Sequence, residues 1–131
     1  MIALDTSAII DLFKGSSNLR AQLEKTKEPF VVTILSYLEL MFGIDYKNKM
    51  SKIEERYYDD FFNSFMVLNL TQEACKKAAQ IHRELEAKGI TIEQFDCTIA
   101  AIILTNGVKE IITGNKKHFE AIKELNVISY N

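Results

Sequence analysis

The chain has 131 residues, of which 47% are hydrophobic and 26% are charged, so it fits one folded domain with a single core and is not a disordered protein. No apolar run approaches the ~20 residues that span a bilayer, and no basic leader precedes the first apolar residues, so we expect a cytoplasmic protein without a membrane segment. The net charge of −2 argues against a broad basic surface for duplex nucleic acid and confines any nucleic-acid contact to a local site.

Short apolar runs alternate with longer amphipathic stretches along the chain. In chain order, the pattern predicts a strand at 2–4, a helix at 18–25, a strand at 30–32, helices at 36–48 and 53–63, a strand at 65–68, helices at 71–88 and 94–105, and strands at 110–113 and 127–129. Strands that alternate with helices pair in parallel, with helices on both faces of the sheet. The predicted fold is therefore a doubly wound α/β domain with a five-stranded parallel sheet, which covers residues 1–131.

Ligands of doubly wound sheets bind at the carboxyl edge of the strands, where the strand order reverses. Polar residues near the ends of strands are therefore the candidate site residues. Asp5 ends the first strand, Glu39 is an isolated charge after the second, Asp96 lies near the start of the apolar helix at 94–105, and Asn115 follows the strand at 110–113. The predicted fold brings all four side chains to one edge of the sheet.

Asp5 and Asn115 also have purely structural interpretations. Aspartate is a good N-cap, and Asp5 stands where a helix after the first strand would begin. Asn115 follows Gly114, and this pair is common in turns. Both interpretations stay open beside the functional one.

Glu39 and Asp96 have structural interpretations of the same kind. Ser36 and Glu39 match a capping box, in which the glutamate reaches back to the serine amide. Thr91 and Gln94 form another plausible capping box, so Asp96 is not needed as a cap, although it would gain ~0.3–1 kcal/mol from the helix dipole. A carboxylate on an almost entirely apolar helix nevertheless needs a partner.

The thiols and imidazoles do not suggest a metal site. Cys75 and Cys97 are the only cysteines, and neither belongs to a CxxC pair, so we expect both to be small core residues without zinc or a disulfide. His82 and His118 are not expected to share a ligand set. The sequence contains no nucleophilic triad and no glycine-rich phosphate loop.

Three carboxylates in one partly buried cleft repel one another strongly unless a cation lies between them. Oxygen ligands without Cys or His favour Mg²⁺ or Mn²⁺, which Asp5, Glu39 and Asp96 would hold. Such a cation can activate a water molecule and stabilise charge on a phosphate. The sequence therefore points to phosphodiester hydrolysis.

Four parts of the chain resemble the PIN domain and, more narrowly, its VapC-type toxin branch. They are Leu4–Ile10, the isolated Glu39, Phe95–Ala101 and Ile112–Phe119. The parts follow one another in the right order and at ordinary spacing, and the resemblance extends over essentially the whole chain. The resemblance implies a compact five-stranded parallel sheet, a metal-dependent endoribonuclease, a homodimer, and a small antitoxin protein that covers the cleft.

The resemblance also assigns roles to the four candidate residues. It implies that Asp5 and Asp96 are the main metal-binding acids and that Glu39 is the third acid of the site. Asn115 falls where many members of the family carry a fourth acid and others carry asparagine, which leaves a second metal ion open.

Basic residues near the last candidate are expected at the rim of the cleft. Lys116, Lys117 and His118 follow Asn115 directly and could hold RNA phosphates, with Lys14 and Arg20 as further candidates. The alternative for each is an ordinary solvated side chain.

The helices at 36–48 and 53–63 carry more apolar residues than one face of each requires. We expect some of these residues to form a groove for an antitoxin helix, and the alternative is core or dimer contact. The candidates are Tyr37, Leu40, Phe42, Tyr57, Phe61 and Phe62.

Three other functions remain open. The first is a PIN nuclease of RNA processing without an antitoxin, and the second is a non-catalytic RNA- or protein-binding module. The third is a phosphotransfer or phosphatase domain, since doubly wound sheets of those enzymes also carry acidic metal sites. A receiver domain usually has an adjacent acidic pair after its first strand and a lysine after its last, whereas here Thr6 follows Asp5 and Gly114 follows Thr113.

Overall fold

The computed structural model describes all 131 residues and contains one five-stranded sheet. The strands are β1 (Ile2–Leu4), β2 (Phe30–Thr33), β3 (Met66–Leu68), β4 (Glu110–Thr113) and β5 (Asn126–Ser129). The helices are α1 (Thr6–Phe13), α2 (Ser17–Glu24), α3 (Ile34–Gly43), α4 (Ser51–Asn63), α5 (Gln72–Ala87), α6 (Gln94–Thr105) and α7 (Lys116–Phe119). The strand order is β3-β2-β1-β4-β5, and every neighbouring pair is parallel. The predicted doubly wound fold is confirmed.

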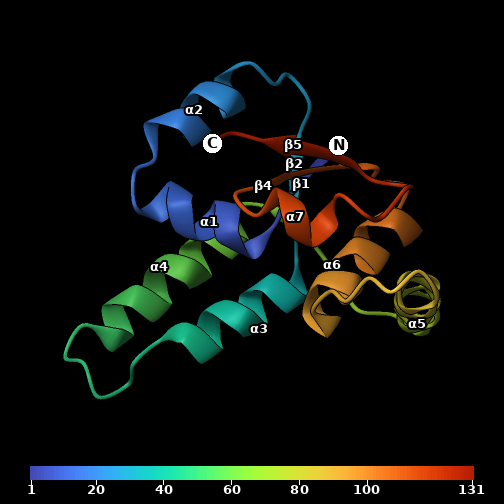
Figure 1. The fold of residues 1–131 in the computed structure, drawn as a ribbon. Coiled ribbons are helices and arrows are strands. Elements are labelled where there is room, and N and C mark those ends of the chain that lie inside the picture. Colours follow the sequence, from blue (N-terminus) through green and yellow to red (C-terminus); the bar gives the residue numbers. More distant parts are fainter.

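Each strand contributes to two separate cores, because successive side chains of a strand point to opposite faces of the sheet. Ala3 and Ile111 belong to one core, and their neighbours Leu4 and Ile112 belong to the other. The first core lies mainly beneath α5 and α6, and the second beneath α1 to α4 (Figure 1). The fold therefore has helices on both faces, as predicted.

Helix α6 packs between the sheet and α5, which explains its apolar sequence (Figure 1). Its buried residues are Cys97, Ile99, Ala100, Ala101, Ile102 and Ile103. The predicted core position of Cys75 is wrong, because this thiol lies on the exposed face of α5. No helix combines the length and the apolar composition needed to cross a membrane.

Two short helices were not predicted, and one predicted helix is shorter than expected. Helix α1 has only eight residues and α7 is a single turn, so neither is long enough for its pattern to stand out in the sequence. Helix α3 ends at Gly43 rather than at Asn48. The side chains of Asp45 and Asn48 accept hydrogen bonds from backbone N–H groups two residues further on, and these local turns replace the helix.

The strand order reverses at β1, which lies between β2 and β4. The chain first winds outward through β2 to β3 and then returns to the other side of β1 to form β4 and β5. The carboxyl ends of β1, β2 and β4 therefore flank the crevice in which sheets of this type bind ligands.

Candidate metal-binding cleft

A cavity of about 660 Å³ opens at the carboxyl edge of the sheet, beside the point where the strand order reverses. Its lining consists of Asp5, Thr6, Ser7, Ile10, Glu39, Glu93, Gln94, Phe95, Asp96, Asn115 and His118. All four candidate residues from the sequence thus face one cleft, although they come from four separate parts of the chain.

Asp5 is buried in this cleft, with 3% of its surface exposed. Its carboxylate caps α1 by accepting a hydrogen bond from the Ala8 N–H at 2.9 Å. It also accepts hydrogen bonds from the hydroxyls of Thr113 at 2.6 Å and Ser7 at 2.8 Å. Burial raises the pKa of Asp5, the hydrogen bonds oppose this rise, and the nearby charge of Glu39 adds to it. The same side chain is therefore both the helix cap and a member of the cleft.

Glu39 reaches the cleft from α3, where it is half-buried. The predicted capping box is wrong, because α3 begins earlier than expected and its N-cap is Thr33, which accepts a hydrogen bond from the Ser36 N–H. The Glu39 carboxylate instead accepts a hydrogen bond from the Thr6 hydroxyl at 2.7 Å. This contact ties α3 to the first turn of α1.

Asp96 lies in the first turn of α6, whose N-cap is Glu93 and not the predicted Thr91. Its side chain is 14% exposed, and its carboxylate oxygen lies 2.9 Å from Nδ1 of His118 on α7. Burial raises the pKa of Asp96 to about 6, His118 opposes the rise, and the charges of Glu39 and Asp5 add to it.

Asn115 is the N-cap residue of α7, and its exposed side chain makes no capping hydrogen bond. Its backbone N–H donates to the Thr113 hydroxyl at 2.9 Å, and the same hydroxyl donates to Asp5. Thr113 therefore links the positions of Asn115 and Asp5.

The cleft is acidic, but it is not a ready-made metal site. No three His, Cys, Asp or Glu side chains of the chain are grouped so that they could hold a metal ion. The carboxylates of Asp5, Glu39 and Asp96 each contact groups of the protein instead. The pKa values of Asp5 and Asp96 are raised, as mutual repulsion would require, but burial is the larger cause in both.

The sequence analysis did not identify the hydroxyl groups that orient the carboxylates. Thr6, Ser7 and Thr113 each donate to an acid of the cleft. The signal was present, because two hydroxyl residues follow Asp5 directly and a third ends the neighbouring buried strand. The contact of His118 with Asp96 has no such signal, since spacing alone does not show that α6 and α7 meet.

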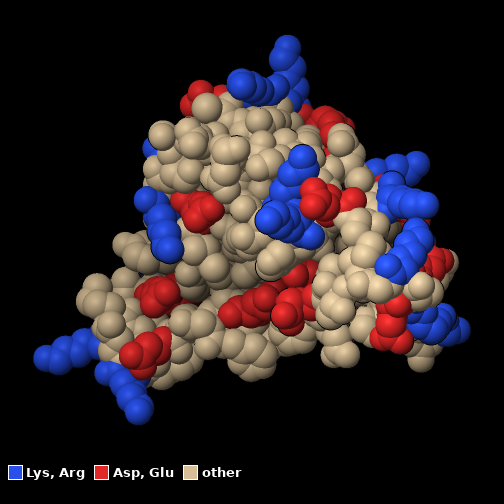
Figure 2. Space-filling model, viewed as in Figure 1, with Lys and Arg blue, Asp and Glu red and all other residues tan.

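Basic residues lie at one rim of the cleft. Figure 2 shows acidic side chains gathered between α3 and α6, with basic side chains over α7 beside them. Lys116 and Lys117 are exposed and take part in no ion pair. Lys14 and Arg20, the other predicted rim residues, do not line the cleft.

A second hollow, of about 490 Å³, continues from the cleft. It shares Asp96 and His118 with the cleft and adds Lys117 and His82. The two histidines thus line one hollow, although they belong to no group that could hold a metal. This hollow extends the cleft along its basic side.

Comparisons with known proteins agree with this architecture. The family model of the PIN domain matches residues 2–125. Ribonuclease VapC1 of Methanocaldococcus jannaschii is 28% identical over 130 residues, which are 99% of this chain and 87% of the relative.

Solved structures of toxin–antitoxin proteins share the fold. The structure of VapBC2 from Rickettsia felis, bound to a DNA fragment from its promoter, matches with a TM-score of 0.85 and 21% identity over 100% of both chains. That of VapBC-1 from nontypeable Haemophilus influenzae matches with a TM-score of 0.83 and 24% identity, over 99% of this chain and 98% of the other.

Proposed function

The chain belongs to the PIN domain family, and from this membership we propose that it is a Mg²⁺- or Mn²⁺-dependent endoribonuclease that hydrolyses RNA phosphodiester bonds. The observation that supports this best is the shared cleft of Asp5, Glu39, Asp96 and Asn115 at the carboxyl edge of the sheet. The similarity to a relative named as a ribonuclease points the same way.

The cleft offers the type of ligand atom that a hard divalent cation prefers. Asp5, Glu39 and Asp96 offer carboxylate oxygens, and no thiol lines the cleft. Burial raises the pKa values of Asp5 and Asp96, and a cation in the cleft would favour the charged forms of both carboxyl groups. We therefore propose these three acids as its ligands, which requires their side chains to move closer together than they lie in this structure. When bound, the cation would stabilise charge on the phosphate and activate a water molecule.

The remaining residues of the cleft would orient these acids and hold the RNA. The hydroxyls of Ser7 and Thr113 keep Asp5 in one orientation, and Thr6 does the same for Glu39. We propose that the ammonium groups of Lys116 and Lys117, which take part in no ion pair, contact RNA phosphates beside the cleft. A local basic rim of this kind is compatible with a net charge of −2.

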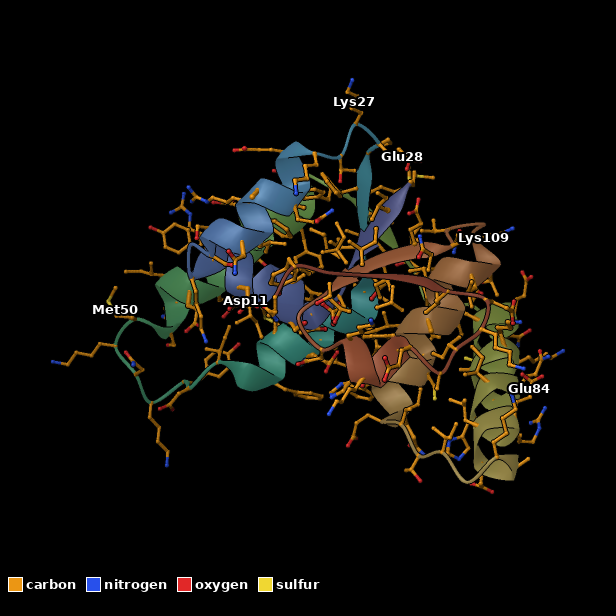
Figure 3. The ribbon with its side chains drawn as sticks, turned by 45° about the horizontal axis from the view of Figure 1, so that its top comes forward. Asp11, Lys27, Glu28, Met50, Glu84 and Lys109 are labelled. Atoms are coloured by element: carbon orange, nitrogen blue, oxygen red, sulfur yellow. The ribbon has the colours of Figure 1, made fainter.

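We propose in addition that the enzyme is the toxin of a VapBC-type pair, that it forms a homodimer and that a small antitoxin protein covers the cleft. The similar solved structures are complexes of this type. An apolar hollow of about 570 Å³ includes Phe13, Met50, Ile53 and Tyr57, and it shares Ile10 with the cleft. Figure 3 shows Met50 at the outer tip of the α3–α4 connection. An amphipathic helix seated in this hollow would reach the cleft.

Only part of the groove predicted from the sequence is available to a partner. Leu40 and Phe62 are core residues, and Tyr37 donates a hydrogen bond to Asp59 at 2.5 Å. Of the predicted set, Tyr57 lines the apolar hollow. The exposed residues that complete the hollow come from α1 and from the start of α4, which the sequence analysis did not include.

Cleavage assays test the enzymatic proposal. The purified protein should cleave RNA when Mg²⁺ or Mn²⁺ is present and should lose this activity in EDTA, with tRNA, rRNA and mRNA as trial substrates. Full activity in EDTA would exclude the metal-dependent mechanism, and no cleavage under any condition would favour the non-catalytic module.

Copurification tests the antitoxin proposal. A neighbouring reading frame that encodes a small DNA-binding protein should yield a complex on co-expression, and the complex should have lower ribonuclease activity than the free enzyme. Active enzyme without such a partner would favour a PIN nuclease of RNA processing.

A further inference from the structure

The turn between β4 and α7 is held from two sides. The Gly114 N–H donates to the Ser7 hydroxyl on α1 at 3.0 Å, and the Gly114 carbonyl accepts a hydrogen bond from the side-chain amide of Asn131 at 3.1 Å. The Tyr130 hydroxyl donates to the Asp11 carboxylate on α1 at 2.5 Å. Segments from both ends of the sequence thus meet around this turn.

The pair of Tyr130 and Asp11 packs directly against the turn. A Cβ atom at position 114 would lie 2.7 Å from the Tyr130 hydroxyl and 3.1 Å from the Asp11 carboxylate, so only glycine fits there. Tyr130 is 8% exposed, and burial together with Asp11 raises the pKa of its hydroxyl. The hydroxyl therefore keeps its proton and donates to the carboxylate, which is one of the stronger types of hydrogen bond.

We propose that Tyr130 and Asp11 are positioning residues for the cleft, since their hydrogen bond sets the spacing between α1 and the β4–α7 turn. Asp5 precedes α1 and Asn115 follows Gly114 in the turn, so this spacing also sets the separation of these two cleft residues. Neither member of the pair lines the cleft itself. The inference rests on the proposed metal-dependent ribonuclease function.

Ser7 links the Tyr130–Asp11 hydrogen bond to Asp5, which neither residue of that pair contacts directly. Its hydroxyl contacts the Asp5 carboxylate at 2.8 Å and accepts the hydrogen bond from the Gly114 N–H. If the turn moves away from α1, the Gly114 contact with Ser7 weakens, and Ser7 no longer holds Asp5 from a fixed position. Loss of the pair is therefore expected to change metal binding as well as stability.

Tyr130→Phe tests the proposal, with Mn²⁺ affinity measured by electron paramagnetic resonance and RNA cleavage measured in parallel. Removing a hydrogen bond to a charged group should weaken Mn²⁺ binding and lower kcat by about tenfold each, with a smaller change in KM. Tyr37→Phe is the matched control, because it removes a Tyr–Asp hydrogen bond of the same 2.5 Å length between α3 and α4. It should lower the melting temperature and leave Mn²⁺ affinity within about twofold of wild type.

Variants of Asp11, the hydrogen-bond partner of Tyr130, separate a positioning role from a packing role. Asp11→Asn keeps an acceptor for the Tyr130 hydroxyl and should retain most Mn²⁺ affinity, whereas Asp11→Ala should resemble Tyr130→Phe. Gly114→Ala should weaken Mn²⁺ binding in the wild-type background and have a much smaller further effect in Tyr130→Phe, because the atom that its Cβ would meet at 2.7 Å is then absent.

Two outcomes contradict the proposal in different ways. Wild-type Mn²⁺ affinity in Tyr130→Phe, or equal effects of Gly114→Ala in both backgrounds, would overturn the positioning role alone. A wild-type protein that neither binds Mn²⁺ nor cleaves RNA would overturn the proposed function, and the inference with it.

Discussion

The two walls of the cleft hold their carboxylates in different ways. On one wall, Asp5 is 3% exposed and accepts hydrogen bonds from the Ala8 amide and from the hydroxyls of Ser7 and Thr113. On the other wall, the Asp96 side chain is 14% exposed and contacts His118, which is itself 47% exposed. Asp5 is therefore fixed in one orientation by several donors, and Asp96 is held by a single partner at the surface.

This difference divides the proposed ligands into one that the protein holds with several donors and one that it holds with a single contact. Several donors stabilise the charge of Asp5 and oppose the effect of burial on its pKa. Asp96 has fewer donors, and its pKa is about 6. The side of the cleft that holds Asp5, the fixed wall, should therefore determine the geometry of the site. The side that holds Asp96, the adjustable wall, should be stabilised more by a bound cation.

The largest effect is expected on the fixed wall, from Asp5→Asn. The change removes a proposed ligand and also turns an amide N–H₂ group toward the donors that now bind the carboxylate. Because a bound metal stabilises phosphate charge by several kcal/mol, kcat/KM for RNA should fall by about 100-fold or more. Cleavage assays with excess Mn²⁺ measure the fall in kcat/KM, and circular dichroism shows whether the variant is folded. Activity within about tenfold of wild type would contradict the assignment.

A smaller effect on the same wall is expected from Thr113→Val. The change removes the 2.6 Å hydrogen bond to Asp5 and keeps the shape of the side chain. Loss of a partner that orients a ligand should weaken Mn²⁺ binding by about 10- to 100-fold. Thr33→Val is the matched control, because Thr33 is equally buried and caps α3 without touching Asp5. The control should lose stability but not metal affinity, and equal loss of affinity in both variants would refute the orienting role.

The sequence predicts the fold well where burial dominates. The bounds predicted for α6 and β4 match the structure, because each has an apolar, buried centre with polar residues at its ends. Helix α1 was missed because it has only eight residues. The end of α3 was misplaced because side chains of the following turns compete for backbone N–H groups.

The candidate site shows a second limit of sequence analysis. The topology argument correctly brought four distant residues to one cleft. The roles of individual residues were less predictable: a shift in the start of α3 replaced the capping box of Glu39 with a contact to Thr6, and Asp5 combines two roles that were treated as alternatives. Contacts between elements decide such details, and spacing along the chain does not contain them.

On the adjustable wall, Asp96→Asn should stabilise the metal-free protein. The pKa of Asp96 is raised from 3.8 to about 6, so between about pH 4 and 6 the native state keeps a proton that the unfolded state has released. The native state therefore loses stability as pH rises through this range. The variant avoids this loss, and in EDTA at pH 7.5 its melting temperature should be higher by about 3–6 °C.

The pH dependence supplies the control for Asp96→Asn. The gain in melting temperature should shrink as the pH approaches about 4. At that pH the wild-type Asp96 carboxyl group is protonated, so it is uncharged like the asparagine of the variant. The response to added Mn²⁺ should also be smaller than in wild type. Asp60→Asn, at an exposed position of α4, should show neither change. If Asp96 acts only through the helix dipole, its loss should lower stability in EDTA, and that result would refute the cluster.

The smallest effect is expected from Asn115→Asp, which adds one more carboxylate to the cleft beside those of Asp5, Glu39, Glu93 and Asp96. Because Asn115 is exposed, solvent screens most of the added repulsion, and the melting temperature in EDTA should fall by only about 1–2 °C. The same charge should tighten Mn²⁺ binding by about two- to fivefold, since it faces the cation without a desolvation penalty. Asn48→Asp adds an equal charge in the loop between α3 and α4, away from the cleft, and should change neither quantity. Both effects of Asn115→Asp should weaken at high salt, because screening shortens the reach of exposed charges. Equal responses of the two variants would mean that net charge, and not the position of Asn115 between the walls, controls metal affinity.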